Sequence, residues 1–125
     1  MKKVFVDKDI YSKPWFRKLS SKHKNLWFWL FTHCDMAGVI TVDWDGVSFQ
    51  CGEFMSPDDL PAMEDNVIVL NAEKFKYLLP GYVDFQYGTM AEISSSSKCS
   101  VHRGVWKCLN SHGLKYPVDR SNPFK

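Results

Sequence analysis

Basic side chains gather in two stretches of the 125-residue chain, where their chemistry suits the binding of anions such as nucleic-acid phosphates. Arg103 and Lys107 are four residues apart, so they share a helical face and can straddle a phosphate backbone. Lys74 and Lys76 flank a predicted hairpin turn. We predict a DNA-binding set that contains Lys13, Arg17, Lys18, Lys22, Lys24, Lys74, Lys76, Lys98, His102, Arg103 and Lys107.

The net charge of +2 conceals a strong asymmetry along the chain. Residues 1–25 hold eight basic and two acidic side chains, whereas residues 26–97 hold two basic and eleven acidic ones. Residues 98–125 again hold six basic side chains against one acidic. Two basic ends around an acidic middle favour binding to nucleic acid. An unevenly charged, solvated surface is the alternative interpretation.

Four cysteines and four histidines raise the question of a metal site. Cys99 and His102, and likewise Cys108 and His112, have spacings that zinc sites use. On one helix, however, His102 and Cys108 lie about 240° apart, so the two pairs point to different sides. We therefore predict free thiols, no metal and no cofactor.

Paired carboxylates are the other candidate for chemistry. Asp43 with Asp45, or Asp58 with Asp59, could hold Mg²⁺ for phosphodiester cleavage. Both pairs stand at predicted helix starts, where aspartate is expected as a cap. The sequence also lacks the common phosphate-loop, serine-hydrolase and zinc-protease motifs. We predict that the protein is not an enzyme.

Five helical segments and three strands are expected to position these residues. Ser12 is predicted to cap a single turn at 14–19, and Ser20 or Ser21 to cap a buried aromatic helix that ends near Cys34. Further helices are predicted over 44–50, 56–65 and 100–111, with Gly113 and Leu114 closing the last one. Strands are predicted at 39–42, 67–70 and 75–79, the last two forming a hairpin. The serine run 94–97 is expected to form an exposed loop.

The order helix, strand, helix, helix, hairpin and final helix is that of a winged-helix domain, although other folds share the same inventory. The fold class is thus predicted as α+β, mainly helical, with an added C-terminal helix. The winged-helix domain is predicted over 1–116, followed by a loose tail over 117–125.

Several short motifs resemble those of phage replication-initiation proteins, the DnaD-like replisome organisers. The most specific is Phe85-Gln86-Tyr87-Gly88, and the next is the turn Pro14-Trp15-Phe16-Arg17-Lys18-Leu19. Others are Cys34-Asp35-Met36-Ala37-Gly38-Val39, Val101-His102-Arg103-Gly104-Val105 and Ser111-His112-Gly113-Leu114. The resemblance runs from about residue 9 to 114, with a gap over 53–66.

The resemblance implies a winged-helix domain that binds duplex DNA at a phage origin. Many members of that family continue into a second domain that contacts the replicative helicase or its loader, whereas this chain stops soon after the last predicted helix. The segment expected to enter the major groove, 56–65, carries four acidic residues and no basic one. Phosphates repel such a segment, so DNA contact is expected from the first helix, the hairpin and the last helix.

A rival hypothesis follows from the same acidic segment and from an aromatic content of 15%. The segment would serve as a docking face or mimic the charge of DNA. Some of the aromatic side chains would also form an exposed patch for self-association or for binding a replication partner. The candidates for this patch are Trp15, Phe16, Trp44, Tyr82, Phe85 and Tyr87. Nucleic-acid binding is favoured if the two basic segments fold onto one face with the hairpin, and the interaction module is favoured if they lie on opposite sides. No apolar stretch approaches a membrane span, so the protein is expected to be soluble and cytoplasmic, in the host cytoplasm if phage-encoded.

Overall fold

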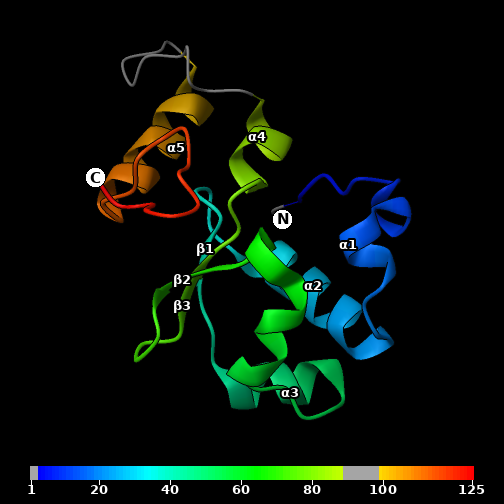
Figure 1. Ribbon diagram of the computed structural model, residues 1–125. Helices are drawn as coiled ribbons and strands as arrows, with labels where there is room; N and C mark the ends of the chain where they lie inside the picture. Colours follow the sequence, from blue (N-terminus) through cyan, green and yellow to red (C-terminus); the bar gives the residue numbers. More distant parts are fainter. Residues whose placement is uncertain (1–2, 89–98) are drawn as a thin grey trace.

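A three-stranded antiparallel sheet joins the two halves of the structure (Figure 1). The structure is a computed structural model that describes residues 3–88 and 99–125. The strands β1 (Val39–Thr41), β2 (Ile68–Asn71) and β3 (Lys76–Leu78) follow the order β1-β3-β2. Leu78 pairs with Val39 on one side and Ile68 on the other. The chain is therefore α+β, as predicted. Lys98 and the serine run 94–97 lie outside the described residues.

The aromatic helix α2 (Ser21–His33) begins as predicted, because the Ser20 hydroxyl accepts the His23 N–H at 3.2 Å. Leu26 and Leu30 are fully buried, and Phe16 from the preceding turn is buried beside them. A consecutive apolar run needs neighbours on most sides, and the N-terminal segment supplies one of them.

That segment contains η1 (Ile10–Ser12), a short 3₁₀ turn, and α1 (Pro14–Arg17). Phe16 meets Phe28 edge to face with ring centroids 5.7 Å apart. The predicted cap by Ser12 is wrong, since Lys13 takes the capping position and no side chain bonds there. Pro14 at the first helical position needs no N–H acceptor, which removes one reason for a cap.

Helix α3 (Trp44–Cys51) ends at Gly52, which has a φ of +77°. Asp43 occupies the capping position of α3, but its side chain makes no capping hydrogen bond. The next segment, η2 (Pro57–Asn66), starts as predicted, with Ser56 accepting the Asp58 N–H and Asp59 accepting the Ser56 N–H.

The segment η2 differs from the expected helix in its helix type and in its continuity. It is 3₁₀ rather than α, and Glu64 breaks it with φ 55° and ψ −136°. Pro61 lies inside the segment and lacks the N–H that an α-helix would use. The part of the chain predicted as a short helix is thus a kinked acidic 3₁₀ segment.

Two further helices complete the described structure. The helix α4 (Tyr82–Tyr87) was not predicted, and it carries the buried residues Tyr82 and Val83. The helix α5 (Ser100–Ser111) matches the predicted range and ends as expected, with Gly113 at a φ of +67° and the Leu114 N–H bonded to the Leu109 carbonyl.

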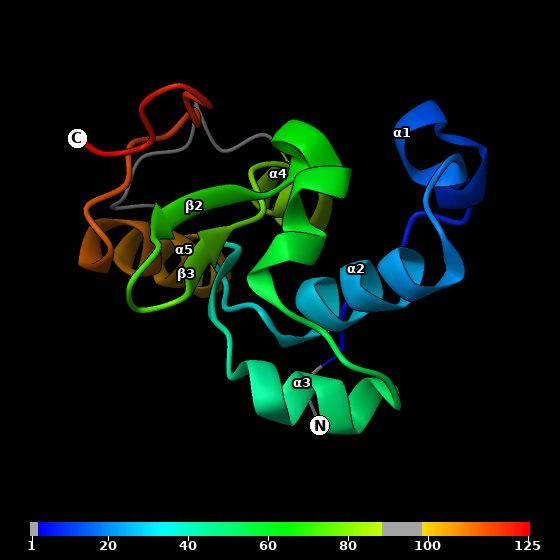
Figure 2. The same ribbon diagram turned by 60° about the horizontal axis from the view of Figure 1, so that its bottom comes forward.

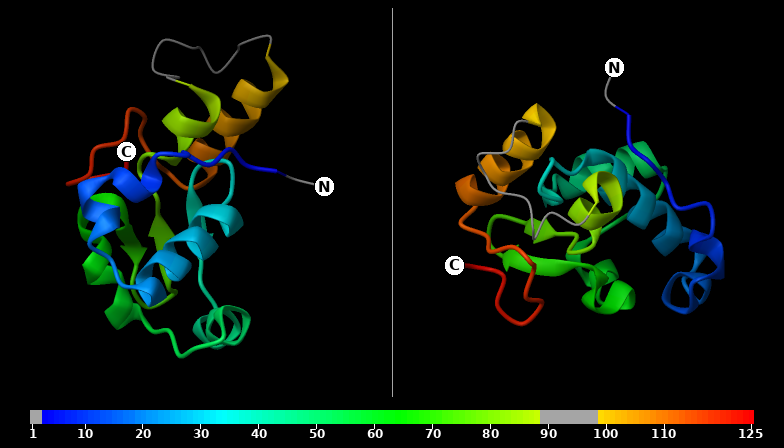
Figure 3. Two further views of the ribbon diagram at one scale, coloured as in Figure 1. Left: turned by 90° about the vertical axis from the view of Figure 1, so that its right-hand side faces the viewer. Right: turned by 90° about the horizontal axis from the view of Figure 1, so that it is seen from above.

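The core divides into two clusters that place α1 and α5 on different sides of the sheet. One cluster joins α1, α2, α3 and η2 to Ile40 and Tyr77 of the sheet, and the other joins Val39 and Leu78, which neighbour them on the same strands, to α4 and α5. Figure 2 and Figure 3 show α5 and the tip of the β2–β3 hairpin toward one side of the molecule and α1 toward the opposite side. None of the helices in the described ranges is long and apolar enough to cross a membrane.

The segment 117–125, expected to be a loose tail, folds back on the preceding residues. Leu114 and Phe124 form an antiparallel bridge, and the Lys125 N–H bonds to the Gly113 carbonyl at 2.9 Å. Arg120 reaches the Asp65 carbonyl in η2. These contacts link the end of the chain to its middle.

Candidate nucleic-acid interface

Lys74 and Lys76 lie at the hairpin turn, residues 72–75, between β2 and β3. The Asn71 side chain accepts the Lys74 N–H at 3.1 Å, and Phe75 closes the turn with a φ of +54°. Lys74 is exposed, whereas Lys76 is half-buried at the start of β3. The turn is thus held by its own backbone bonds and presents a lysine to solvent.

Helix α5 is strongly amphipathic. Val105 and Leu109 are fully buried against the sheet side, while Arg103 and Lys107 are exposed. His102 is half-buried. We call Lys74, Lys76, Arg103 and Lys107 the hairpin–α5 basic group, because the hairpin and α5 lie toward the same side of the molecule (Figures 1 and 2).

The other predicted residues form an N-terminal basic group, which comprises Lys13, Arg17, Lys18, Lys22 and Lys24. Three of them are ion-paired within the protein: Lys13 lies 3.2 Å from Asp7, and Lys22 lies 3.2 Å from Asp59. Lys18 pairs with Glu64. Of the remaining two, Arg17 is exposed and the Lys24 ammonium lies 6.0 Å from the Phe16 ring centroid.

Asp59 has a central part in the ion pairing of the N-terminal basic group. Its carboxylate lies 3.0 Å from His23 Nε2 and accepts the Ser56 N–H at 2.9 Å. Burial raises the pKa of the Asp59 carboxyl, but the bonds from Ser56, His23 and Lys22 outweigh that effect and hold the pKa below its ordinary value. The acidic segment η2 therefore binds the N-terminal basic group instead of facing a ligand with it.

The structure does not bring the two basic groups together. In Figure 1 the helix α5 and the hairpin lie on the left, and α1 with the start of α2 lies on the right. The segment η2 stands between them (Figure 2). The predicted DNA-binding set thus divides into an N-terminal group, of which Lys18 and Lys22 pair with η2, and a hairpin–α5 group on the far side. This division is the arrangement expected of an interaction module, so DNA contact by all of the predicted residues on one face is not supported.

The cysteine and histidine pairs separate as the helical geometry requires. Cys108 and His112 lie together at the end of α5, whereas Cys99 and His102 do not join them. Burial, and then the charge of Asp35, raise the pKa of the Cys108 thiol. Burial likewise raises the pKa of Cys34 to about 12, so this thiol stays protonated.

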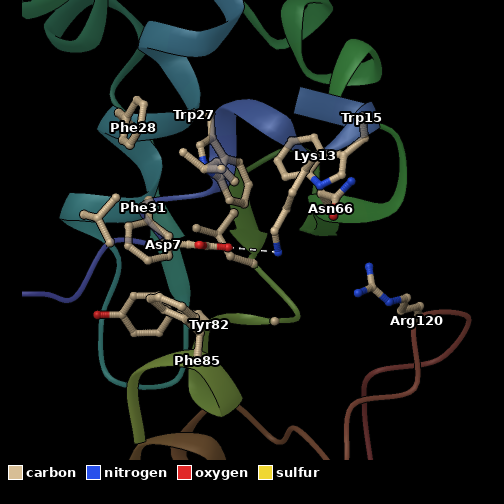
Figure 4. A pocket seen from close by; sticks show the side chains of 14 residues that line it. Asp7, Lys13, Trp15, Trp27, Phe28, Phe31, Asn66, Tyr82, Phe85 and Arg120 are labelled. Atoms are coloured by element: carbon tan, nitrogen blue, oxygen red, sulfur yellow. Dashed lines mark ion pairs between the residues drawn. The ribbon is translucent and has the colours of Figure 1, made fainter. Parts of the chain in front are cut away.

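A cavity of about 210 Å³ opens between the N-terminal segment, α2 and α4 (Figure 4). Aromatic rings of Trp27, Phe31 and Tyr82 form part of its wall, and the Asp7–Lys13 ion pair stands at its edge. Arg120 reaches the same cavity from the end of the chain. Sequence reasoning missed this cavity because its lining comes from residues more than one hundred positions apart.

The acidic partners of the N-terminal group were also missed. Asp59 gives a capping signal in the sequence, but nothing in its spacing indicates a contact with Lys22 or His23, more than thirty residues earlier. Comparison of the chain with protein-family models, curated proteins and solved structures finds no match. The geometry described above is therefore the basis for the functional proposal.

Proposed function

We propose that this chain is a winged-helix protein that binds duplex DNA through its phosphates and acts in the initiation of phage-type DNA replication. The observation that carries the proposal is the hairpin–α5 basic group: Lys74, Arg103 and Lys107 are exposed, and the two elements that carry them lie on the left of Figure 1. The role in replication rests on the resemblance of the sequence motifs to replisome organisers.

The winged-helix assignment is supported by the order of elements. Helix α2, strand β1, helix α3, segment η2 and the β2–β3 hairpin follow the order expected of that fold, and the sheet order is β1-β3-β2. The hairpin turn would then serve as the wing, which carries Lys74. Helix α5 extends the scaffold and adds Arg103 and Lys107.

The segment η2 occupies the position where a recognition helix would stand, and its properties exclude reading of base edges in the usual manner. It is acidic, kinked at Glu64, and ion-paired through Asp59 and Glu64 to the N-terminal basic group. Base edges are read by arginine, lysine, asparagine or glutamine on a regular helix. We therefore expect phosphate contacts that position the protein with little dependence on DNA sequence.

The test is duplex DNA binding measured by fluorescence anisotropy over a series of salt concentrations. The charge reversals K74E/K76E and R103E/K107E should each weaken binding by about tenfold or more at low salt, since each removes two phosphate contacts. The slope of log affinity against log salt should fall by about 2 for each pair.

A matched control uses Arg17, which is exposed, and Lys24, which is half-buried, both in the N-terminal basic group on the other side. The variant R17E/K24E changes the net charge equally but should lower affinity by less than about threefold, because only the long-range field changes. An equal loss in this control would contradict the proposed face. A wild-type protein that fails to bind duplex DNA at low salt would contradict DNA binding altogether.

A second candidate is a protein-interaction module, either self-associating or docking a replication partner such as the helicase or its loader. Phe49 and Phe54 favour it, because their exposed fractions are 88% and 74%, with Phe49 in the last turn of α3 and Phe54 just after the helix. Of the aromatic residues predicted for such a patch, Trp44 and Tyr82 are buried, whereas Phe85 is 43% exposed. An apolar patch of this kind marks an interaction site more often than a DNA contact.

A further inference from the structure

Asp35, Cys108 and His112 meet at the junction between the turn after α2 and the end of α5. Their ligand atoms (a carboxylate oxygen, the sulfur and an imidazole nitrogen) all lie within 4.8 Å of one another. The Asp35 Oδ2 to His112 Nε2 distance is 2.7 Å. Figure 1 shows this turn beside α5, although Asp35 is 77 positions from His112.

We propose that Asp35, Cys108 and His112 form a three-ligand site for a thiophilic divalent cation, Zn²⁺ being the best fit, with the fourth position open to water. A thiolate, an imidazole and a carboxylate are ligands that zinc accepts in tetrahedral sites. Magnesium and calcium are disfavoured, since both prefer sites built from oxygen alone. The site does not depend on the proposed DNA binding.

The backbone at the site is held by contacts that do not involve a metal. The Asp35 N–H bonds to the Val39 carbonyl at 2.9 Å, and Gly38, with a φ of +82°, closes the turn by bonding back to the Asp35 carbonyl at 3.0 Å. Val105 and Leu109 are fully buried and fix α5 beside this turn. The three ligand positions are therefore set before any ion arrives.

The Asp35 carboxylate is oriented for coordination by its own hydrogen bonds. Oδ1 accepts the backbone N–H groups of Ala37 at 2.9 Å and Val39 at 3.0 Å, so Oδ2 is the oxygen that faces His112. Such bonds to a ligating carboxylate are the outer support that metal sites commonly use. Oδ2 can bind a cation while both bonds to Oδ1 persist.

Cys108 and His112 are four residues apart on α5, so their side chains leave the helix from one face. Zinc bond lengths of about 2.0 to 2.3 Å imply ligand atoms about 3.3 to 3.8 Å apart in a tetrahedron. Asp35 Oδ2 and His112 Nε2, at 2.7 Å, are closer than this range, and all three ligand atoms lie within 4.8 Å of one another. Binding an ion therefore requires the Asp35 and His112 side chains to move apart, and it releases the thiol proton of Cys108 to solvent.

The alternative is a purely structural Asp35–His112 hydrogen bond that ties α5 to the body. The site has partial access to solvent, with side-chain exposures of 37% for Asp35 and 19% for His112. An ion can therefore enter without unfolding. Because the bound ion would join α5 to the turn after α2, zinc should stabilise the protein as well as bind it.

The test is titration of the reduced, metal-free protein with ZnCl₂ by calorimetry, and with CoCl₂ by absorbance. We expect one zinc per chain, a thiolate-to-cobalt charge-transfer band, and a thermal midpoint raised by about 10 °C at zinc a hundredfold above its Kd. The variant C108S should weaken zinc binding by about 100-fold or more and abolish the cobalt band.

Two controls keep the test decisive. The variant C99S removes the exposed cysteine at the start of α5 and should leave the zinc affinity unchanged. If C108S fails to fold, D35N serves instead, because its amide oxygen can still accept the Ala37 and Val39 N–H groups while the anionic ligand is lost. Absence of stoichiometric zinc binding, or zinc binding that survives in C108S, would overturn the proposal.

Discussion

Asp59 shows how one side chain decides which basic residues face solvent. Its carboxylate receives the Ser56 N–H and faces both Lys22 and His23, and its side chain is 13% exposed. A hydrogen-bonded carboxylate at this degree of burial is held as an anion. The pairing makes Lys22 a weak candidate for DNA contact.

Asp59 should therefore make stability depend on pH in the acid range. Because the folded protein lowers the pKa of Asp59 below its value of about 3.9 in the unfolded chain, its contribution is full only above about pH 5. That contribution is lost as the pH falls through the folded pKa. We expect D59N to lower the free energy of unfolding by about 1 to 2 kcal/mol at pH 7. The difference from wild type should shrink below pH 4 in urea unfolding.

Asp58 provides the control for this prediction. It is the adjacent acidic residue on η2, but its side chain is exposed, whereas Asp59 is the residue that pairs with Lys22 and His23. D58N should change stability by less than about 0.5 kcal/mol. A D59N effect that is the same at pH 3 and pH 7 would show that packing, not charge, is responsible.

At the scale of elements, the buried apolar side chains of helix α5 lie on one face of the helix. Leu109 is fully buried in the cluster with Val105 and Leu78, whereas Val101 on the same helix is 47% exposed. L109A should therefore destabilise the protein by about 2 to 5 kcal/mol, since it opens a cavity under the helix. V101A should cost less than about 0.5 kcal/mol. Thermal and urea unfolding of both variants would measure the difference, and equal effects would contradict this packing.

The sequence predicts most elements whose signals are local. The Ser20 and Ser56 caps and the left-handed Gly113 depend on residues within a few positions, and all three are confirmed. Helix α4 (Tyr82–Tyr87) was not predicted because Pro80 and Gly81 suggest a turn, and burial of Tyr82 and Val83 against distant residues is what stabilises the helix. Tertiary contacts override weak local preference in such segments.

The 3₁₀ geometry of η2 is a second feature that local sequence signals do not predict. Ser56, Pro57 and Asp59 give a strong helix start, and that start is observed. The sequence gives no comparable signal for the 3₁₀ geometry or for the break at Glu64, whose side chain pairs with Lys18 on a separate element. Helix starts are set by side-chain bonds nearby, whereas the path of a short segment depends on what it packs against.

At the scale of the whole molecule, the candidate sites depend on contacts far apart in sequence. Arg103 and Lys107 were predicted to share a helical face, and both are exposed on α5. The contact of Asp35 with His112 and that of Lys22 with Asp59 could not be predicted, because no periodicity relates residues on separate elements. Spacing identifies residues that share an element, and only the fold places two elements side by side.

The two candidate functions use different surfaces, and we expect them to respond to salt in opposite ways. DNA binding by the hairpin–α5 basic group should fall steeply between about 50 and 200 mM salt, because counterion release drives it. Association through the exposed Phe49 and Phe54 rings should persist or strengthen over the same range, since it buries apolar surface and salt does not screen it.

Sedimentation velocity and DNA anisotropy on the same samples would separate these surfaces. The variant F49S/F54S should abolish any concentration-dependent rise in mass and leave DNA affinity within about twofold, because neither ring lies on the hairpin or α5. The variant K74E/K76E should weaken DNA binding and leave any concentration-dependent rise in mass unchanged. A mass that stays monomeric at every concentration would contradict self-association through α3. A rise in mass that salt suppresses would instead indicate that opposite charges on separate copies, not the phenylalanine rings, hold them together.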